Sequence, residues 1–230
     1  MANLFIVATP IGNLEDISLR ALRILKEVDI ILCEDTRVTR KLLSRYDITT
    51  QVLSYHQHSQ LKKINYIADL LEKGKNLALV SDSGTPGISD PGNKLIDFLT
   101  RNNIDLTIIP IPGCSALITA ASISGFPMDR FTFLGFPPHK KKRNKFFEEL
   151  LKIEHPVAFY ESPHRIIKTL EEIGNKSQEF NLSPQIIVCR ELTKKFETVY
   201  RGAIDEVIKK IKDDKIKGEF TVIIYKNYAI

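Results

Sequence analysis

Three polar side chains follow an apolar run near the start of the chain. Glu34, Asp35 and Arg37 come directly after Ile30–Cys33, a stretch typical of a strand that is covered on both faces. A carboxylate at a strand end can accept a proton from a hydroxyl nucleophile, and a guanidinium can hold a phosphate or orient a carboxylate. Because successive strand residues point to opposite faces, we expect one of the two carboxylates to reach a ligand. Glu34, Asp35 and Arg37 are therefore candidate catalytic residues, with structural ion pairing as the alternative.

A long polar loop follows another apolar run, Leu77–Val80. It reads Ser81-Asp-Ser-Gly-Thr-Pro-Gly-Ile-Ser-Asp-Pro-Gly92, with three glycines and two prolines. Exposed backbone amides and hydroxyls suit a small polar ligand, and open parallel sheets bind ligands outside the carboxyl ends of their strands. The alternative is a turn that starts the next helix, because the same residue types build turns.

A basic segment occurs in the second half of the chain. Its cations are Lys140, Lys141, Lys142, Arg143 and Lys145, and two phenylalanines follow. Such a segment suits phosphate contacts in RNA, while the phenylalanines are expected to anchor the next helix. The alternative is a solvated helix start, although the N-terminus of a helix disfavours cations.

The net charge is confined to the same half. The chain has 33 Lys and Arg against 28 Asp and Glu, a formal charge of +5. Residues 1–113 are neutral, so residues 114–230 carry the whole excess. A polyanionic partner is therefore expected on the second half, unless the charge serves only solubility.

Several function classes have no support in the sequence. There is no GxGxxG after the first apolar run, no GxxxxGK[ST] and no GxSxG. The three cysteines form no CxxC pair, and His56 and His58 lack further ligands at suitable spacing, so we expect no metal. The N-terminus does not resemble a signal peptide and no apolar run is long enough to span a bilayer, so we expect a cytoplasmic protein.

Apolar runs and amphipathic stretches alternate in the first half. Strands are expected at 4–8, 30–33, 52–54, 77–80 and 106–109, with helices between them. This alternation predicts a parallel sheet with helices on its faces. The run Ile109-Pro-Ile-Pro-Gly113 should stop any regular element, so we place a boundary between domains 1–112 and 113–230. Short strands outnumber helices in the second half, which predicts a mixed sheet.

Seven segments resemble those of a known family. The chain is similar to the tetrapyrrole methylase-like, class III S-adenosylmethionine methyltransferases, and within them to the ribosomal RNA small subunit methyltransferase I family. The segments are ATPIGNLEDIS (8–18), EDTRVTRKLL (34–43), SYHQHS (54–59), SDSGTPGISDPG (81–92), IPGCSALITA (111–120), YESPHR (160–165) and RELTKKFE (190–197).

This resemblance implies a fold, a cofactor and an activity. The fold would have two α/β domains, with S-adenosyl-L-methionine in the cleft between them. The enzyme would methylate the ribose 2′-hydroxyl of a cytidine in the decoding region of 16S rRNA in the small subunit, and would act as a homodimer. The implied cofactor contacts are Pro10, Val80, Ser81, Asp82, Gly84, Ile88, Ser115, Ala116, Tyr160, Glu161 and Leu192.

Two alternatives and two departures accompany the resemblance. The alternatives are a methyltransferase of the same superfamily acting on a tetrapyrrole or another small substrate, and a non-catalytic RNA-binding assembly factor. The basic segment argues against the first alternative, and the polar loop argues against the second. The family commonly has Glu and Asn where this chain has Gln57 and Ser59, so a catalytic carboxylate at residue 57 is not expected. The family also frequently has alanine after the loop aspartate, where this chain has Ser83, a change that should not alter the turn.

Overall fold

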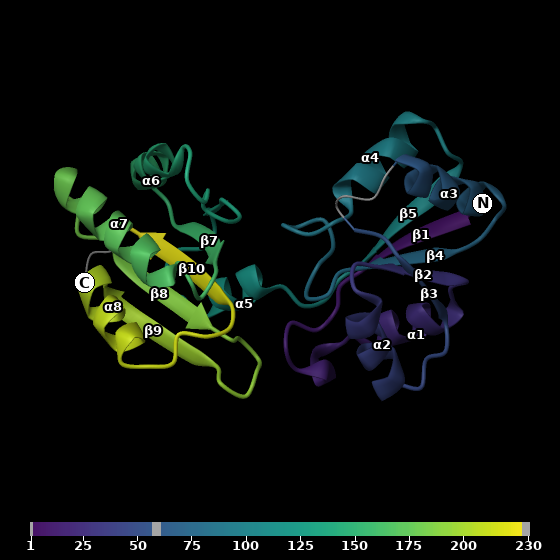
Figure 1. Cartoon of the computed structure of the whole chain (residues 1–230), viewed down its shortest axis with the longest axis horizontal. Helices are drawn as coiled ribbons and strands as arrows, with labels where there is room; N and C mark the ends of the chain where they lie inside the picture. Colours follow the sequence, from purple (N-terminus) through teal and green to yellow (C-terminus); the bar gives the residue numbers. More distant parts are fainter. Residues whose placement is uncertain (1, 57–60, 227–230) are drawn as a thin grey trace. The chain divides into compact units, whose positions relative to one another are not determined.

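The computed structural model describes residues 2–56 and 61–226, and it divides into two compact units, Met1–Ser115 and Ala116–Ile230 (Figure 1). The division falls three residues after the expected boundary. Contacts explain the shift. A Cβ atom at Gly113 would lie 3.0 Å from the Ala8 Cβ, and the Thr85 hydroxyl donates to the Cys114 carbonyl at 3.1 Å. Residues 113–115 therefore pack with the first unit.

The first unit is built on a five-stranded parallel sheet in the order β3-β2-β4-β1-β5. Helices cover both faces, with α1 and α2 on one side and α3 and α4 on the other (Figure 1). The central strands β2 and β4 are buried along their whole length, as their unbroken apolar sequences predict. The strands are β1 (Ala2–Val7), β2 (Ile30–Cys33), β3 (Gln51–Ser54), β4 (Leu77–Val80) and β5 (Leu106–Ile111). The helices are the short 3-10 helix η1 (Leu14–Asp16) and α1 (Leu19–Glu27), α2 (Thr36–Arg45), α3 (Leu61–Glu72) and α4 (Asn93–Arg101).

Strand β5 corrects one expectation from the sequence. It was expected to end at Ile109, before the two prolines, but it continues through Pro110 to Ile111. Pro110 pairs in register with Ile6 of β1, and β5 has no second neighbour in the sheet. An edge strand tolerates proline because the missing N–H can face away from the ladder.

The second unit is built on a mixed sheet in the order β6-β7-β10-β8-β9, as the sequence predicted. Strand β10 is antiparallel to both β7 and β8, and β6 is parallel to β7. The carboxyl ends of β6, β7 and β8 therefore lie at one edge of the sheet, together with the start of β10. The strands are β6 (Thr132–Phe133), β7 (Val157–Glu161), β8 (Gln185–Arg190), β9 (Thr198–Ala203) and β10 (Phe220–Tyr225). The helices are α5 (Ala116–Ser122), α6 (Arg143–Lys152), α7 (Ile166–Glu179) and α8 (Ile204–Lys212).

Apolar packing holds this second unit together. Strands β7, β8 and β10 form one core with α6, α7 and α8, and Phe147 and Phe159 are among its fully buried side chains. Phe147 anchors α6 in that core, as expected from its place after the basic segment. Across the described ranges 2–56 and 61–226, no helix combines the length and apolar character needed to cross a membrane.

Candidate active site

The carboxyl ends of β2, β3 and β4 surround a hollow of about 570 Å³ in the first unit. Open parallel sheets bind ligands at this edge. The lining is polar and charged: Glu34, Asp35, Thr36, Arg37, Ser54, His56 and Asp82. The structure thus brings the three candidate catalytic residues together with Asp82, one of the implied cofactor contacts.

Asp35 and Arg37 are bound to each other. Asp35 is the N-cap of α2, where its carboxylate accepts from the backbone N–H of Arg37 at 2.8 Å. The Arg37 guanidinium also donates to this carboxylate, with Nη2 2.6 Å from Oδ2. These hydrogen bonds lower the pKa of Asp35 to about 2. A carboxylate with such a low pKa is a weak proton acceptor. The geometry therefore favours structural ion pairing of Asp35 with Arg37 over a catalytic role.

Glu34 is held in a different environment. It is partly buried, and its carboxylate has no hydrogen-bond partner among residues 2–56 and 61–226. Burial raises the pKa of this carboxyl above its ordinary value of 4.5, and the negative charge of Asp82 raises it further, against the opposing effect of His56. A carboxylate with a raised pKa is a better proton acceptor, so Glu34 is a better candidate for a general base than Asp35.

Asp82 connects two strand ends across the hollow. Its Oδ1 accepts from the backbone N–H of Asp35 at 3.0 Å, which ties the loop after β4 to the end of β2. Sequence reasoning gave no sign of this bond, because it joins residues 47 positions apart. The distance between the polar loop and Glu34 therefore depends on Asp82.

The polar loop folds back onto the end of β1. Thr9 and Gly84 exchange two backbone hydrogen bonds of 2.9 and 3.0 Å, directly before Pro10. The buried Thr9 hydroxyl also donates to the Ser81 carbonyl at 3.0 Å. Gly84 has a φ of +82°, which side chains rarely adopt. These hydrogen bonds fix the conformation of the loop. The contribution of Thr9 was not predicted from the sequence.

The remaining implied cofactor contacts of the first unit differ in exposure. Val80 is buried with its side chain in the sheet core, so only its backbone can meet a ligand. Ile88 is exposed on the polar loop. Ser115 is partly buried at the end of the first unit.

Ser54 and His56 of the SYHQHS motif line the hollow. The second histidine of this motif, His58, and the departures at Gln57 and Ser59 lie outside the described residues. Within the described part of the chain, no three His, Cys, Asp or Glu side chains group as metal ligands would.

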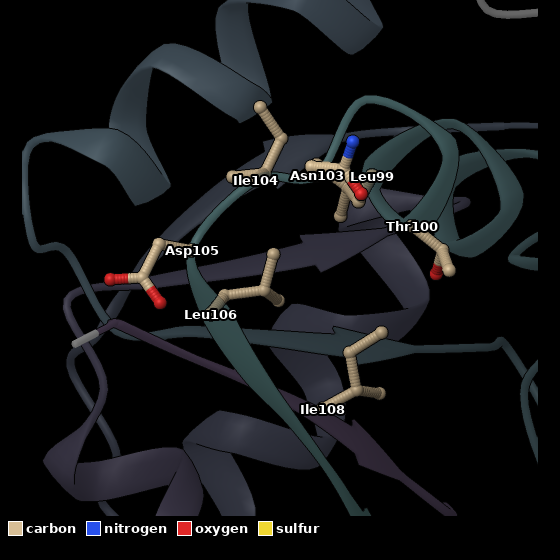
Figure 2. Close-up of a pocket in the computed structure, with 7 residues that line it drawn as sticks. All are labelled: Leu99, Thr100, Asn103, Ile104, Asp105, Leu106 and Ile108. Carbon is tan, nitrogen blue, oxygen red and sulfur yellow. The ribbon is translucent and has the colours of Figure 1, made fainter.

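A second hollow, of about 370 Å³, lies where α4 leads into β5, at the opposite edge of the sheet (Figure 2). Aliphatic side chains such as Leu106 and Ile108 line it, and the carboxylate of Asp105 points away from them (Figure 2). This edge carries the amino ends of the strands rather than the carboxyl ends at which open parallel sheets bind ligands, so we place no chemistry there.

In the second unit, the implied contacts Tyr160, Glu161 and Leu192 lie at the edge where β6, β7 and β8 end. Tyr160 contacts the ring of Phe136, with the centroids 5.5 Å apart. Leu192 is buried in the loop after β8. Glu161 is buried and fully engaged: its carboxylate accepts from Arg165 Nη2 at 2.7 Å and from the Thr169 hydroxyl at 2.6 Å. Glu161 therefore stabilises this edge, and both oxygens of its carboxylate are already bound to protein groups rather than available to a ligand. Ala116 begins α5.

Arg143 does not lie where the basic segment predicted. Its side chain is 7% exposed and donates to Glu172, to the Thr169 hydroxyl and to the Pro138 carbonyl. A guanidinium with these partners is unavailable to a phosphate, so we remove Arg143 from the expected RNA contacts. The other four cations, Lys140, Lys141, Lys142 and Lys145, are exposed.

Comparison with known proteins agrees with this arrangement. Residues 3–208 match the family model described as Tetrapyrrole (Corrin/Porphyrin) Methylases. The chain belongs to the tetrapyrrole methylase family. It is 47% identical to the ribosomal RNA small subunit methyltransferase I of Mycoplasmopsis pulmonis, over the whole of both chains. It is 43% identical to that of Thermotoga maritima, over 97% of this chain and 98% of the relative.

Comparison with solved structures confirms the α/β fold. A cobalt precorrin-4 methyltransferase matches 97% of the chain with a TM-score of 0.72 and 18% identity, covering 94% of its own chain. A uroporphyrin-III-C-methyltransferase from Thermus thermophilus matches 98% with a TM-score of 0.65 and 16% identity, covering 95% of its own chain. At these identities the likeness concerns the fold. Family membership confirms the expected class, an S-adenosylmethionine-dependent methyltransferase.

The residues present fit the family's cofactor. S-adenosylmethionine carries ribose hydroxyls, an amino acid group and a cationic sulfonium, which call for backbone donors and acceptors and a nearby carboxylate. The polar loop offers backbone groups between Ser81 and Gly84, and Asp82 offers the carboxylate. A Cβ at Gly92 would lie 3.1 Å from Leu79 Cδ2, so glycine there allows the loop to pack closely on β4.

Proposed function

We propose that this protein transfers a methyl group from S-adenosylmethionine to the ribose 2′-hydroxyl of a cytidine in the decoding region of 16S rRNA. The observation that carries the proposal is the 47% identity, over both whole chains, to a ribosomal RNA small subunit methyltransferase I. The exposed lysines of the second unit supply the positive charge that an RNA substrate requires.

The roles of the residues follow from their environments. The cofactor supplies an electrophilic methyl group, and the family resemblance assigns its contacts to Pro10, Val80, Ser81, Asp82, Gly84, Ile88, Ser115, Ala116, Tyr160 and Leu192. Glu34 accepts the proton of the ribose hydroxyl, which is a poor nucleophile while protonated. Asp35 caps α2 with Arg37 as its partner, and Asp82 fixes the polar loop against β2. The remaining contribution is alignment of the reacting atoms.

A radiolabelled methyl assay tests this function directly. Wild-type protein is given S-adenosylmethionine labelled on its methyl group, together with assembled small subunits, naked 16S rRNA or a tetrapyrrole. We expect label in the rRNA, at the 2′-oxygen of one cytidine. Label in the tetrapyrrole alone would establish the small-substrate alternative. RNA binding without any methyl transfer or cofactor binding would establish the assembly factor.

The exposed lysines give a second prediction. Replacing Lys140, Lys141, Lys142 and Lys145 together with Gln should weaken RNA binding and flatten its salt dependence, because about 0.7 to 0.9 counterions are released per neutralised phosphate. The ion pair of Lys145 with Glu149, at 3.7 Å between exposed groups, competes only weakly. Fluorescence anisotropy over a series of salt concentrations measures the slope. Isothermal titration calorimetry with S-adenosylmethionine should show unchanged cofactor affinity. An unchanged slope of log RNA affinity against log salt concentration would contradict the prediction and assign the lysines to solubility alone.

The assembled state and location complete the proposal. We infer that the protein acts as a homodimer in the cytoplasm, where small subunits mature, and the family resemblance supports both points. Sedimentation equilibrium of the purified chain should give twice its 26.2 kDa mass.

A further inference from the structure

Two exposed phenylalanines lie at the edge of the second sheet that carries the implied cofactor contacts Tyr160 and Leu192. Phe136 follows β6 and is 53% exposed, and Phe196 follows β8 and is 64% exposed. Because β6, β7 and β8 end at the same edge, both rings lie in loops at one edge of the second sheet. Strands β6 and β8 are three positions apart in the sheet, which corresponds to about 14 Å.

Lysines accompany both rings. Lys140, Lys141 and Lys142 are exposed on the segment that contains Phe136, and the Lys195 Nζ lies 5.7 Å from the centroid of the Phe196 ring. A singly exposed apolar side chain needs no explanation. Aromatic rings beside lysines along one edge match the arrangement by which proteins bind single-stranded nucleic acid, with cations on the phosphates and rings stacked on the bases.

Hydrogen bonds to backbone carbonyls fix the segment that carries Phe136. Arg165 Nη1 donates to the Pro137 carbonyl at 3.1 Å, and Arg143 Nη1 donates to the Pro138 carbonyl at 2.9 Å. The backbone N–H of Tyr160 donates to the Gly135 carbonyl at 2.9 Å. The ring is therefore presented to solvent by a fixed backbone, which reduces the entropy that binding would cost.

The loop that carries Phe196 is also fixed. The Lys194 ammonium binds Glu191 and Glu219, at 2.8 and 2.9 Å, across the start of β10. The backbone N–H of Glu197 donates to the Lys194 carbonyl at 3.1 Å, which closes a turn around Phe196. Lys194 is thus occupied in holding the loop, and Lys195 is the exposed cation beside the ring.

We propose that Phe136 and Phe196 are stacking platforms for unpaired bases of the RNA substrate. The inference rests on the proposed function and extends it, because it assigns recognition of single-stranded nucleotides to a named pair of side chains. Stacking of this kind tolerates any base, so it places the strand, while other contacts select the cytidine. The nearby Tyr160 would bring the strand held by Phe136 close to the methyl donor.

Binding of a short fluorescein-labelled single-stranded RNA to the full chain tests the proposal. Phe136→Ala and Phe196→Ala should each raise the Kd about tenfold. The slope of log affinity against log salt should stay unchanged, because no cation is lost. Phe180→Ala is the matched control: Phe180 is also exposed, but it follows α7 and precedes β8, at the other edge of the sheet. Its Kd should stay within about twofold of wild type.

Further variants separate stacking from apolar contact with a protein. Phe196→Trp should bind the RNA at least as well as wild type, whereas Phe196→Leu should bind as weakly as Phe196→Ala. Equal binding by Phe196→Leu and wild type would overturn stacking and favour an apolar protein contact. Wild-type affinity in both alanine variants, or no RNA binding by wild type, would also overturn the proposal.

The methyl assay on small subunits distinguishes failure of the stacking proposal from failure of the proposed function. If wild type methylates the rRNA while both alanine variants bind RNA normally, only the stacking proposal fails. If wild type transfers no methyl group to rRNA, the proposed function fails whatever the variants bind.

Discussion

Glu34→Gln should lower the rate of methyl transfer at least tenfold while S-adenosylmethionine still binds. Glutamine keeps the size of the side chain but cannot accept the hydroxyl proton, and general base catalysis contributes about 10²–10⁴-fold in rate. Glu34 is the carboxylate of the hollow that combines partial burial with a raised pKa. Single-turnover transfer to small subunits measures the chemical step, and calorimetry measures cofactor affinity.

The pH dependence gives this prediction a second measurement. A general base works in its ionised form, so kcat/KM should rise with pH until Glu34 is fully deprotonated. Because burial and the charge of Asp82 raise the pKa of Glu34, this rise should be centred above 4.5. Asp35, with its pKa of about 2, stays ionised throughout and contributes no step in this range.

Asp35→Asn is the matched control for Glu34→Gln. It removes the charge that pairs with Arg37 and weakens the cap of α2, so it should lower thermal stability. Its activity should keep the pH-dependent rise, which Glu34→Gln should lose. Full activity in Glu34→Gln, or an unchanged rise in that variant, would show that another group takes the proton.

The strands of the first unit were predictable because local sequence decides them. Runs such as Ile30–Cys33 and Leu77–Val80 are unbroken and apolar, and the structure begins and ends β2 and β4 at those residues. Local rules failed at Pro110, where the edge position of β5 outweighs the tendency of proline to end a strand. The edge position is a property of the whole sheet, so no window of sequence contains it.

The candidate site was predictable as a set of residues, but their individual roles were not. The spacing in Glu34-Asp-Thr-Arg37 suggested a carboxylate and an ion pair without saying which carboxylate took which role. The cap of α2 and the bond from Asp35 to Asp82 decide that, and the second joins distant parts of the chain. Arg143 illustrates the same limit, since its partner Glu172 lies 29 residues away.

Glu161→Ala should strongly destabilise the second unit. The Glu161 side chain is fully buried, and it accepts from Arg165, from the Thr169 hydroxyl and from the Ser162 N–H. Its removal leaves the Arg165 guanidinium without its carboxylate. It also leaves a buried hydroxyl short of an acceptor, since Thr169 accepts from Arg143 at 2.5 Å. Breaking such a buried pair costs about 3–5 kcal/mol.

Glu172→Ala provides the comparison that identifies burial as the cause. Glu172 also binds an arginine, but its side chain is 27% exposed, and its partner Arg143 keeps the Thr169 and Pro138 contacts. Its loss should cost about 1.5–3 kcal/mol, the range for a hydrogen bond to a charged group, and so less than the loss of Glu161. Native-state hydrogen exchange can report each unit separately. The amides of β7, β8 and β10 should lose protection in Glu161→Ala, and those of β1 and β4 should not. Equal losses of amide protection in the two variants would contradict this prediction, because they would show that burial of the Glu161 carboxylate makes no difference to stability.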